Sequence, residues 1–428
     1  MRAGPSQEEI RRHNLGTLLR YVHVRGPTSR AELTARLGLN RSTIGALTAD
    51  LAAAGLVTEG LPADHGRAGR PSLVVRPESE RFYVYAFTIE VDRVTAARVG
   101  LGGVVLNRRQ IPRPRGDRPA NKVVAPLAEF VRDMERAASA NAICIGSAAA
   151  VSAIVRQEDG LVRLGGYVGW VDEPLGQALS EAIGDARGVD ITPTVRNGAD
   201  LAALAEHTRG VAEGIDNVIY LHGDAGVGGG IIAGGRAVTG HGGYGGEVGH
   251  MAVNPQGRQC TCGSRGCWET EIGEYALIRA AGRDGSGRDA VAAVVDAASR
   301  GDAMAQASLR QVGDWLGFGV SNLVNIFNPE MIIFGGTLRD VYLASAAQVR
   351  GRLNRMCVQA IREHVRLRTP ALGDDAELIG AAELAFERLL NDPIDVATGN
   401  SADPEAVPRL PVQAGAPQAE TDLEGDQA

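Results

Sequence analysis

The first 80 residues place apolar side chains, helix caps and glycines in an order that few folds can accommodate. Apolar residues recur at helical spacing over residues 8–26, and a Gly-Pro pair ends this predicted helix. Ser29, followed three positions later by Glu32, predicts a capping box at the start of a second helix. Gly38 then interrupts the chain in the manner of a helix-turn-helix turn.

A third helix and two strands complete this segment. Asn40 is the predicted cap of a helix with the sequence RSTIGALTADLAAAG, and the two strands are LVTEG and LVVRPE. The turn between the strands, PADHGRAGRPS, is rich in glycine, proline and arginine. Three helices followed by a β-hairpin predict a winged helix-turn-helix over residues 1–80.

A winged helix-turn-helix binds DNA by inserting its recognition helix into the major groove, where the N-terminal side chains of that helix meet base edges. The predicted contacts are hydrogen-bonding side chains: Asn40, Arg41, Ser42 and Thr43. Arg41 can contact guanine through two hydrogen bonds. Arg67 and Arg70, in the turn between the strands, suit a narrow minor groove. The alternative for this segment is a three-helix module that contacts protein.

The charge distribution agrees with a DNA-binding N-terminus. Residues 1–80 carry a net charge of +3, whereas the remainder of the chain carries −10. No apolar run of about 18 residues is present, so we expect no transmembrane helix. The N-terminus lacks the apolar core of a signal peptide, and we therefore expect a cytoplasmic protein.

The remainder of the chain alternates strand and helix patterns, which predicts an α/β fold in two halves. We place the first half at residues 81–193 and the second at residues 194–390, with the option that the last helices return to the first half. Residues 391–428 are rich in Pro, Ala, Gly and acidic residues, which predicts a disordered acidic tail.

Three of the five cysteines fall within eight residues, in the segment GHMAVNPQGRQCTCGSRGCWE. Cys260, Cys262 and Cys267, together with His250, supply the four N and S ligands that tetrahedral zinc prefers. All four positions around the ion would be filled by protein, so the predicted zinc site is structural. The alternative is three reduced thiols near an unrelated histidine.

The order of motifs resembles the ROK family, whose name joins repressors, open reading frames and kinases. The motifs are the winged helix, GEVGHM, CTCGSRGCWE, NPEMIIFGG and IGAAELA, and the resemblance covers roughly residues 10–392. It implies an actin-like (ribonuclease-H-like) sugar-kinase fold with two α/β lobes around a sugar-binding cleft. It also implies the zinc ligands His250, Cys260, Cys262 and Cys267. The sugar ligands that it implies are Asn197, Glu247, His250 and Glu269.

Three departures from the family pattern argue against phosphoryl transfer. Gly198 stands where family kinases carry the catalytic Asp that takes the proton from the sugar hydroxyl. The first phosphate turn is replaced by TIEVDRVTAAR, which lacks a glycine pair. In the second turn, GDAGVGGG, Ala225 replaces a threonine. We therefore expect a catalytically inactive kinase-like domain.

These observations predict a transcriptional regulator, a repressor of carbohydrate-related genes, that binds operator DNA as a homodimer or homotetramer and senses a sugar or sugar phosphate. One alternative is an ATP-dependent kinase of a hexose or N-acetylhexosamine, with Asp200 as a displaced base and an attached DNA-binding domain. Another is a regulator controlled by a protein partner, whose response would not depend on Glu247 or Glu269.

Overall fold

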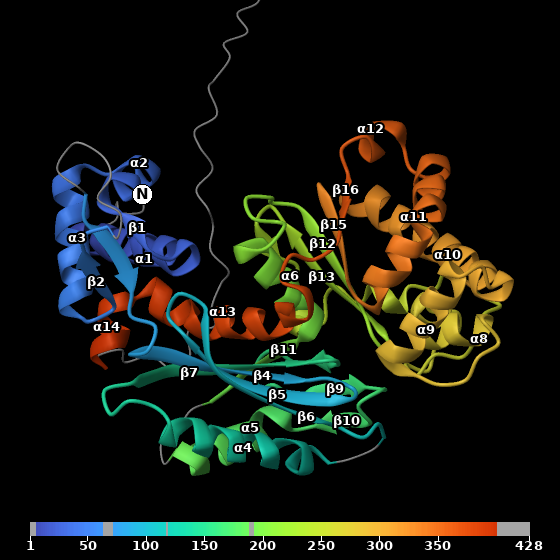
Figure 1. Ribbon diagram of the computed structural model, residues 1–428, viewed down its shortest axis with the longest axis horizontal. Coiled ribbons are helices and arrows are strands. Elements are labelled where there is room, and N and C mark those ends of the chain that lie inside the picture. Colours follow the sequence, from blue (N-terminus) through green and yellow to red (C-terminus); the bar gives the residue numbers. More distant parts are fainter. Residues whose placement is uncertain (1–5, 63–71, 117–118, 188–191, 400–428) are drawn as a thin grey trace, which may run out of the picture.

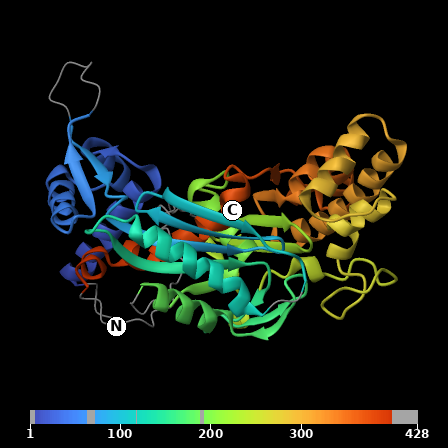
Figure 2. The ribbon, with the colours of Figure 1, turned by 60° about the horizontal axis from the view of Figure 1, so that its bottom comes forward.

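Two five-stranded sheets form the body of the chain, and a small helical unit stands at one end (Figure 1). The computed structural model describes residues 6–62, 72–116, 119–187 and 192–399. In two views the small helical unit and the helices of the second lobe lie at opposite ends of the molecule (Figures 1 and 2).

The N-terminal unit is the predicted winged helix-turn-helix. Its three-stranded sheet has the order β1-β3-β2. The elements are α1 (Gln7–Arg25), β1 (Thr28–Ser29), α2 (Arg30–Leu37), α3 (Arg41–Ala53), β2 (Val57–Gly60) and β3 (Val74–Pro77). The tip of the β2–β3 hairpin, with Arg67 and Arg70, lies outside the described residues.

Local chemistry sets the boundaries of these helices. The Ser29 hydroxyl accepts a hydrogen bond from the backbone N–H of Glu32 and so caps α2, as predicted. The capping box is not completed, because the Glu32 carboxylate accepts a hydrogen bond from the Tyr21 hydroxyl instead. Gly38 adopts the left-handed conformation, φ 66°, which ends α2 and turns the chain into α3.

The first lobe is built on a mixed sheet of order β11-β7-β4-β5-β6. Helices α4 and α5 cover one face of this sheet, and α13 lies across the other (Figure 1). A separate sheet of three short strands, in the order β10-β9-β8, lies beside β11 and was not predicted. The elements are β4 (Phe82–Ile89), β5 (Arg93–Gly100), β6 (Val104–Pro112), α4 (Ala120–Arg136), β7 (Ile143–Val151), β8 (Ile154–Val155), β9 (Val162–Gly165), β10 (Trp170–Glu173), α5 (Leu175–Arg187) and β11 (Thr194–Asn197).

The second lobe has the sheet order β14-β13-β12-β15-β16. Its strands and the helix that leads into it are α6 (Gly198–Arg209), β12 (Val218–Gly223), β13 (Val227–Ala233), β14 (Arg236–Ala237), β15 (Met331–Gly336) and β16 (Arg366–Arg368). Its other helices are α7 (Glu269–Ile272), α8 (Glu274–Ala280), α9 (Gly287–Ser299), α10 (Ala303–Phe327), α11 (Thr337–Met356) and α12 (Gln359–Arg362), with short 3₁₀ turns at His241–Gly243, Val248–His250 and Gly373–Asp375.

The C-terminal helices return to the first lobe and to the N-terminal unit. Helix α13 (Ala376–Asn391) packs against β7, β4, α6 and α1, and α14 (Pro393–Thr398) packs against α1 and α3. The prediction of a disordered tail from residue 391 is therefore wrong in its first part, since Pro at the first helical position favours a short helix there. Residues 400–428 lie outside the described residues.

Strand β11 belongs to the sheet of the first lobe, although its residues were expected to begin the second lobe. The second half was expected to begin at Thr194, but β11 pairs in parallel with β7 of the first sheet, with Asn197 opposite Val151. The second sheet starts with β12. Asn197 therefore lies at the carboxyl end of a first-lobe strand, next to the helix that leads into the second lobe.

Candidate functional site: the cleft between the lobes

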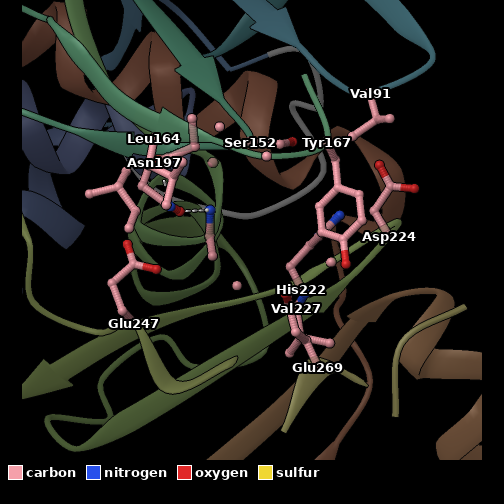
Figure 3. A pocket seen from close by; sticks show the side chains of 18 of the residues that line it. Val91, Ser152, Leu164, Tyr167, Asn197, His222, Asp224, Val227, Glu247 and Glu269 are labelled. Atoms are coloured by element: carbon pink, nitrogen blue, oxygen red, sulfur yellow. Dashed lines mark hydrogen bonds between the residues drawn. The ribbon is translucent and has the colours of Figure 1, made fainter. Parts of the chain in front are cut away.

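A cleft lies where the carboxyl end of β11, the β12–β13 turn and the N-terminus of α13 converge (Figure 3). All four predicted sugar ligands line this cleft, although they come from segments far apart in the sequence. They are Asn197, Glu247, His250 and Glu269. Figure 3 shows Asn197 and Glu247 toward one side of the cleft and Tyr167 and Asp224 toward the other.

Asn197 is held in place by the protein itself. Its side-chain amide donates to the Ala153 carbonyl at 3.0 Å, and its Oδ1 accepts from the Ala199 backbone N–H at 2.7 Å. The second bond caps the N-terminus of α6. The side chain is thus fixed in orientation, with one amide N–H and one oxygen lone pair still available to a ligand in the cleft.

The two glutamates occupy different surroundings. Glu269 is 5% exposed, its Oε2 accepts from the Val227 backbone N–H at 3.3 Å, and its Oε1 accepts from the Cys260 thiol at 2.8 Å. Burial, together with the charge of Glu269, raises the pKa of Glu247 to about 7. Both carboxyl groups can accept hydroxyl hydrogens from a ligand in the cleft.

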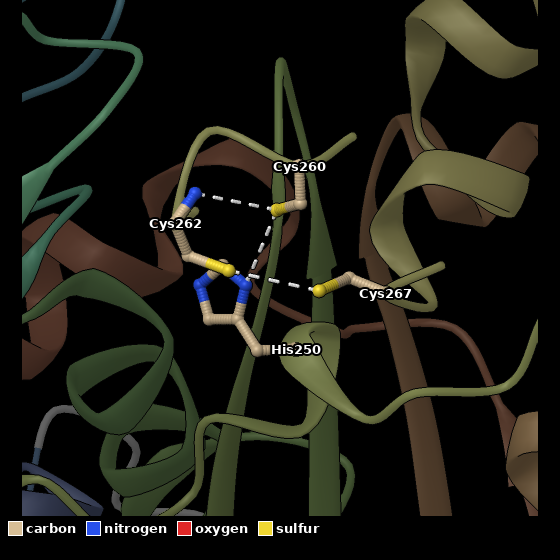
Figure 4. Close-up of side chains that lie close together, drawn as sticks. All are labelled: His250, Cys260, Cys262 and Cys267. Atoms are coloured by element: carbon tan, nitrogen blue, oxygen red, sulfur yellow. Dashed lines mark hydrogen bonds between the residues drawn. The ribbon is translucent and has the colours of Figure 1, made fainter. Parts of the chain in front are cut away.

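The predicted metal ligands converge into one cluster (Figure 4). The ligand atoms of His250, Cys260, Cys262 and Cys267 all lie within 4.8 Å of one another. The Sγ atoms of Cys262 and Cys267 are 3.7 Å apart, and tetrahedral Zn–S bonds of ~2.3 Å require a separation of ~3.8 Å between two sulfurs. The donor set and its spacing fit a Cys₃His site for a divalent metal.

The metal cluster also borders the cleft. His250 Nδ1 lies 3.6 Å from Cys260 Sγ, and the His250 side chain lines the cleft as well. Glu269 accepts a hydrogen bond from Cys260 and lines the cleft from the start of α7. A metal at this point would hold the His250 ring directly, and it would replace the Cys260 thiol proton that Glu269 accepts.

The position of the missing catalytic base is filled from another helix. A Cβ atom at Gly198 would lie 2.8 Å from the carboxyl carbon of Glu377, the second residue of α13. Burial, and then the nearby charge of Glu90, raises the pKa of Glu377 to about 8. A side chain at position 198 would force this carboxyl group, which is the end of a flexible side chain, to move.

The first turn that holds phosphate in family kinases is a tight hairpin between β4 and β5 in this chain. Glu90 sits in this hairpin and accepts a hydrogen bond from the Arg93 guanidinium at 2.7 Å. Arg113 donates to the backbone carbonyls of Glu90 and Val91, at 3.4 and 3.0 Å. The Glu90 carboxylate and these two carbonyls are thus occupied by Arg93 and Arg113.

The second turn that holds phosphate in family kinases lies between β12 and β13 in this chain, and it carries a further acidic side chain. Asp224 lines the cleft and is 6% exposed. Burial raises the pKa of Asp224 to about 6, while burial lowers the pKa of His222. Sequence reasoning identified this turn through Ala225 and the glycines, but it assigned no role to Asp224, His222, Tyr167 or Glu377.

The predicted DNA-contacting residues lie at the start of α3. Arg41 and Ser42 are exposed there, and Thr43 is half-buried. Asn40 accepts from the Thr43 backbone N–H at 2.8 Å and from the Ser42 hydroxyl at 2.7 Å, so its side chain mainly caps the helix. This cap leaves Arg41 as the exposed side chain best suited to reach a base.

A protein-family comparison matches residues 85–388 to the family described as "ROK family". The chain belongs to the ROK family. The predicted resemblance is therefore confirmed, and the matched residues include both lobes and the candidate metal cluster.

ROK relatives include regulators and kinases. The xylose repressor of Bacillus subtilis (strain 168) is 23% identical over 387 residues, which is 90% of this chain and 98% of the repressor. A ROK family transcriptional regulator described as a homologue of the E. coli MLC protein covers 91% of this chain and 100% of its own, at TM-score 0.72 and 24% identity.

A ROK glucokinase from Streptomyces griseus, solved with glucose and AMPPNP, is also similar in structure. Its TM-score is 0.59 at 27% identity, over 71% of this chain and 99% of the kinase. These neighbours confirm the predicted fold, an N-terminal winged helix followed by a two-lobed actin-like domain. Within the described residues, no helix combines the length and apolar character needed to cross a membrane.

Proposed function

We propose that this protein is a DNA-binding transcriptional repressor of carbohydrate-related genes, with a kinase-like domain that senses a sugar and does not phosphorylate it. The observation that carries the second half of the proposal is the carboxyl group of Glu377 against Gly198. It fills the space that the side chain of a catalytic base would need. The similarity to the xylose repressor of Bacillus subtilis supports the first half.

The kinase alternative is less well supported. Asp200, the predicted displaced base, is absent from the residues that line the cleft within the described chain, and burial, with Glu247 nearby, raises its pKa to about 8. Asp200 is therefore not among the side chains that the cleft presents to a bound sugar. A coupled ADP-release assay with a panel of hexoses and N-acetylhexosamines tests this point, and sugar-dependent turnover would overturn the proposal.

In the proposed regulator, Arg41 at the start of α3 reads a base in the major groove, and Asn40 with Ser42 fixes the start of that helix. Arg67 and Arg70 of the wing contact the neighbouring minor groove. A homodimer or homotetramer presents two winged helix-turn-helix units to an operator with two-fold symmetry. Asn197, Glu247, His250 and Glu269 bind the sugar.

The proposed zinc is structural. His250, Cys260, Cys262 and Cys267 hold the ion, which supplies no reaction and ties the segment around residue 250 to the start of α7. The sugar ligands Glu247 and Glu269 belong to the same two segments. Zinc would thus preserve the shape of the cleft in which the effector binds.

The deciding experiment is selection of genomic DNA fragments by the purified protein at near-physiological salt, followed by sequencing. We expect a few enriched fragments that share an inverted repeat and lie beside carbohydrate genes. Arg41→Ala should weaken binding of the operator by about 1–3 kcal/mol, because the variant loses the contact to one base pair. Arg300→Ala, an exposed arginine in the second lobe, is the matched control. Uniform enrichment, or an Arg41→Ala variant as tight as the parent, would overturn the DNA-binding assignment.

A further inference from the structure

A second pocket lies in the second lobe, apart from the cleft between the lobes. It is open to solvent and has a volume of about 390 Å³, which is within the usual range for small-molecule sites. Its walls are a hairpin over residues 254–266, which contains two of the candidate metal ligands, and the helices α7, α8 and α10. Among the described residues, none lines both this pocket and the cleft.

Three guanidinium groups line this pocket without a carboxylate partner among the described residues. Arg258 and Arg265 belong to the 254–266 hairpin, and Arg279 belongs to α8. The side chain of Arg258 makes no hydrogen bond or ion pair within the described chain. Arg265 donates to the Gly257 carbonyl at 2.9 Å, and Arg279 donates to the Thr270 carbonyl at 3.4 Å. Each guanidinium group has five N–H donors, so all three retain donors for a ligand.

The pocket is positively charged, although the chain as a whole carries −7. Its described lining contains three arginines and a single carboxylate, Glu271, which gives a formal charge of +2. Glu271 already accepts a hydrogen bond from the Asn254 amide at 2.8 Å. Burial, and then the nearby charge of Arg258, lowers the pKa of Arg279. Arg258 and Arg279 thus lie close enough to repel each other, and a bound anion would relieve this repulsion.

The hairpin holds its two arginines at fixed positions. The Gly266 N–H donates to the Arg258 carbonyl at 2.8 Å, and Gln259 pairs with Arg265 across the hairpin in an isolated β-bridge. The backbone at both arginines is therefore ordered before a ligand binds. A site that is already ordered loses less conformational entropy on binding.

The side chains of this pocket match a phosphate group. A guanidinium group presents paired N–H donors whose geometry fits phosphate oxygens, which is why phosphate sites in proteins favour arginine. The amides of Gln256 and Gln311 also line the pocket and can bind hydroxyl groups beside the phosphate. The pocket therefore offers charge to a phosphate and neutral hydrogen-bonding groups to the remainder of a small molecule.

The position of the pocket does not suit the phosphates of operator DNA. Helices α8 and α10 lie at the end of the molecule opposite the winged helix-turn-helix (Figures 1 and 2). This placement favours a small phosphate-bearing molecule over the DNA that the winged helix-turn-helix would bind.

We propose that Arg258, Arg265 and Arg279 form a binding site for the phosphate dianion of a small metabolite, separate from the sugar cleft. The inference goes beyond the proposed function and does not depend on sugar binding or DNA binding by this chain. Inorganic phosphate and phosphate monoesters share this chemistry, and their relative affinities distinguish them.

The first test is isothermal titration calorimetry on the unmodified protein at near-physiological salt. The probes are inorganic phosphate, glycerol 3-phosphate and glycerol. We expect both phosphates to bind saturably at one site per chain and glycerol not to bind, because the dianion supplies the attraction. Tighter binding of glycerol 3-phosphate than of inorganic phosphate assigns the site to a phosphate monoester, and the reverse order assigns it to free phosphate. Absence of binding by both phosphates would overturn the proposal.

The second test removes one guanidinium group at a time. Arg258→Gln and Arg279→Gln should each weaken phosphate binding about tenfold, since each loses a hydrogen bond to a charged group. The matched control is Arg300→Gln, which removes the same charge from an exposed position of the second lobe outside the pocket and should bind phosphate as the parent does. The melting temperature of each variant separates loss of fold from loss of binding.

Two further results would exclude the proposed location. If Arg258→Gln and Arg279→Gln both bind phosphate as tightly as Arg300→Gln, the phosphate binds elsewhere and the proposal fails. If both variants bind labelled duplex DNA more weakly than the parent in phosphate-free buffer, these arginines belong to a DNA-binding surface and the proposal fails. Operator selection and sugar binding are measured separately, so a failure of the proposed function would leave this result unchanged.

Discussion

At the scale of single residues, one glycine and the four side chains of the candidate metal cluster determine most of the chemistry available to the cleft. Gly198 leaves room that Glu377 fills, so a carboxyl group is present but comes from α13 and not from the start of α6. The thiols and imidazole of the metal cluster come from a short segment, so their convergence depends mainly on local folding.

Replacement of one candidate metal ligand should lower both the zinc content and the stability of the protein. Cys262→Ser is expected to lower zinc content, measured by atomic absorption, and to lower the free energy of unfolding by several kcal/mol, since zinc contributes an apparent ~10–16 kcal/mol in small zinc domains. Cys144→Ser, which lies outside the cluster, is the control. A Cys262→Ser variant with full zinc content and unchanged stability would contradict the assignment.

At the scale of elements, α6 and α13 both run from the cleft to the DNA-binding unit. Helix α6 starts at the Asn197 cap and ends at Arg209, whose guanidinium donates to Glu383 at 2.5 Å and to the Val24 carbonyl of α1 at 3.2 Å. Glu383 of α13 also accepts from His23 of α1 at 3.2 Å. A ligand that shifts either helix therefore acts directly on α1.

The junction of these helices predicts a dependence of stability on pH. The Gly102 N–H donates to His23 Nδ1 at 2.8 Å, so the buried ring is neutral and donates to Glu383 through Nε2. Burial lowers the pKa of His23, despite the opposing effect of Glu383. The unfolded chain takes up a proton near pH ~6.5 and the folded chain does not, so stability is lost as the pH falls below that value.

This dependence can be measured as the free energy of unfolding in urea at pH 7 and pH 5. We expect the wild type to lose stability on acidification and His23→Gln to lose less, since glutamine does not titrate in this range. His364→Gln, at an exposed position, should behave as the wild type. Equal losses in the wild type and His23→Gln would exclude His23 as the source.

Loss of the Arg209 contacts at this junction should weaken the effect that a sugar in the cleft has on operator binding. Arg209→Gln should leave sugar affinity within about twofold, because Asn197 is at the other end of the helix, and should reduce the effect of sugar on operator affinity. Couplings between sites are typically ~1–3 kcal/mol. Fluorescence anisotropy of labelled operator, with and without the bound sugar, measures this change. If sugar changes the operator affinity of Arg209→Gln as much as that of the wild type, Arg209 does not transmit the effect.

At the scale of the whole molecule, the DNA-binding unit and the first lobe share one hydrophobic core. Leu15, Leu18 and Leu19 of α1 are in the same cluster as Phe386 and Leu389 of α13. The backbones approach so closely that a Cβ at Gly16 would lie 2.5 Å from the Leu390 carbonyl oxygen. The DNA-binding unit is thus packed onto the first lobe and is not a freely tethered domain.

The shared core predicts that the DNA-binding unit is unstable alone. Separation of residues 1–80 exposes the α1 leucines, and each buried leucine contributes about 1.5–3 kcal/mol. We expect the isolated fragment to melt without cooperativity, or well below the full chain, by circular dichroism. A cooperative transition at the melting temperature of the full chain would contradict this expectation.

The sequence by itself determined the features that depend on short-range geometry. Ser29 caps α2 because its hydroxyl lies three residues from the N–H that it accepts. Likewise, the cysteine spacing brings thiols together within one short segment, which is why this cluster of candidate metal ligands was predictable. The family motifs also located Asn197, Glu247, His250 and Glu269 in one cleft.

Only the tertiary structure decided which groups complete the cleft and how it reaches the DNA-binding unit. Glu377 is 179 positions from Gly198 in sequence, and no local pattern relates them. A proline at the first position favours α14, but the surface of α1 and α3 on which residues 393–398 pack is not revealed by composition. Contacts between distant segments depend on how layers stack, and helical or strand periodicity specifies only the buried face, not its partner.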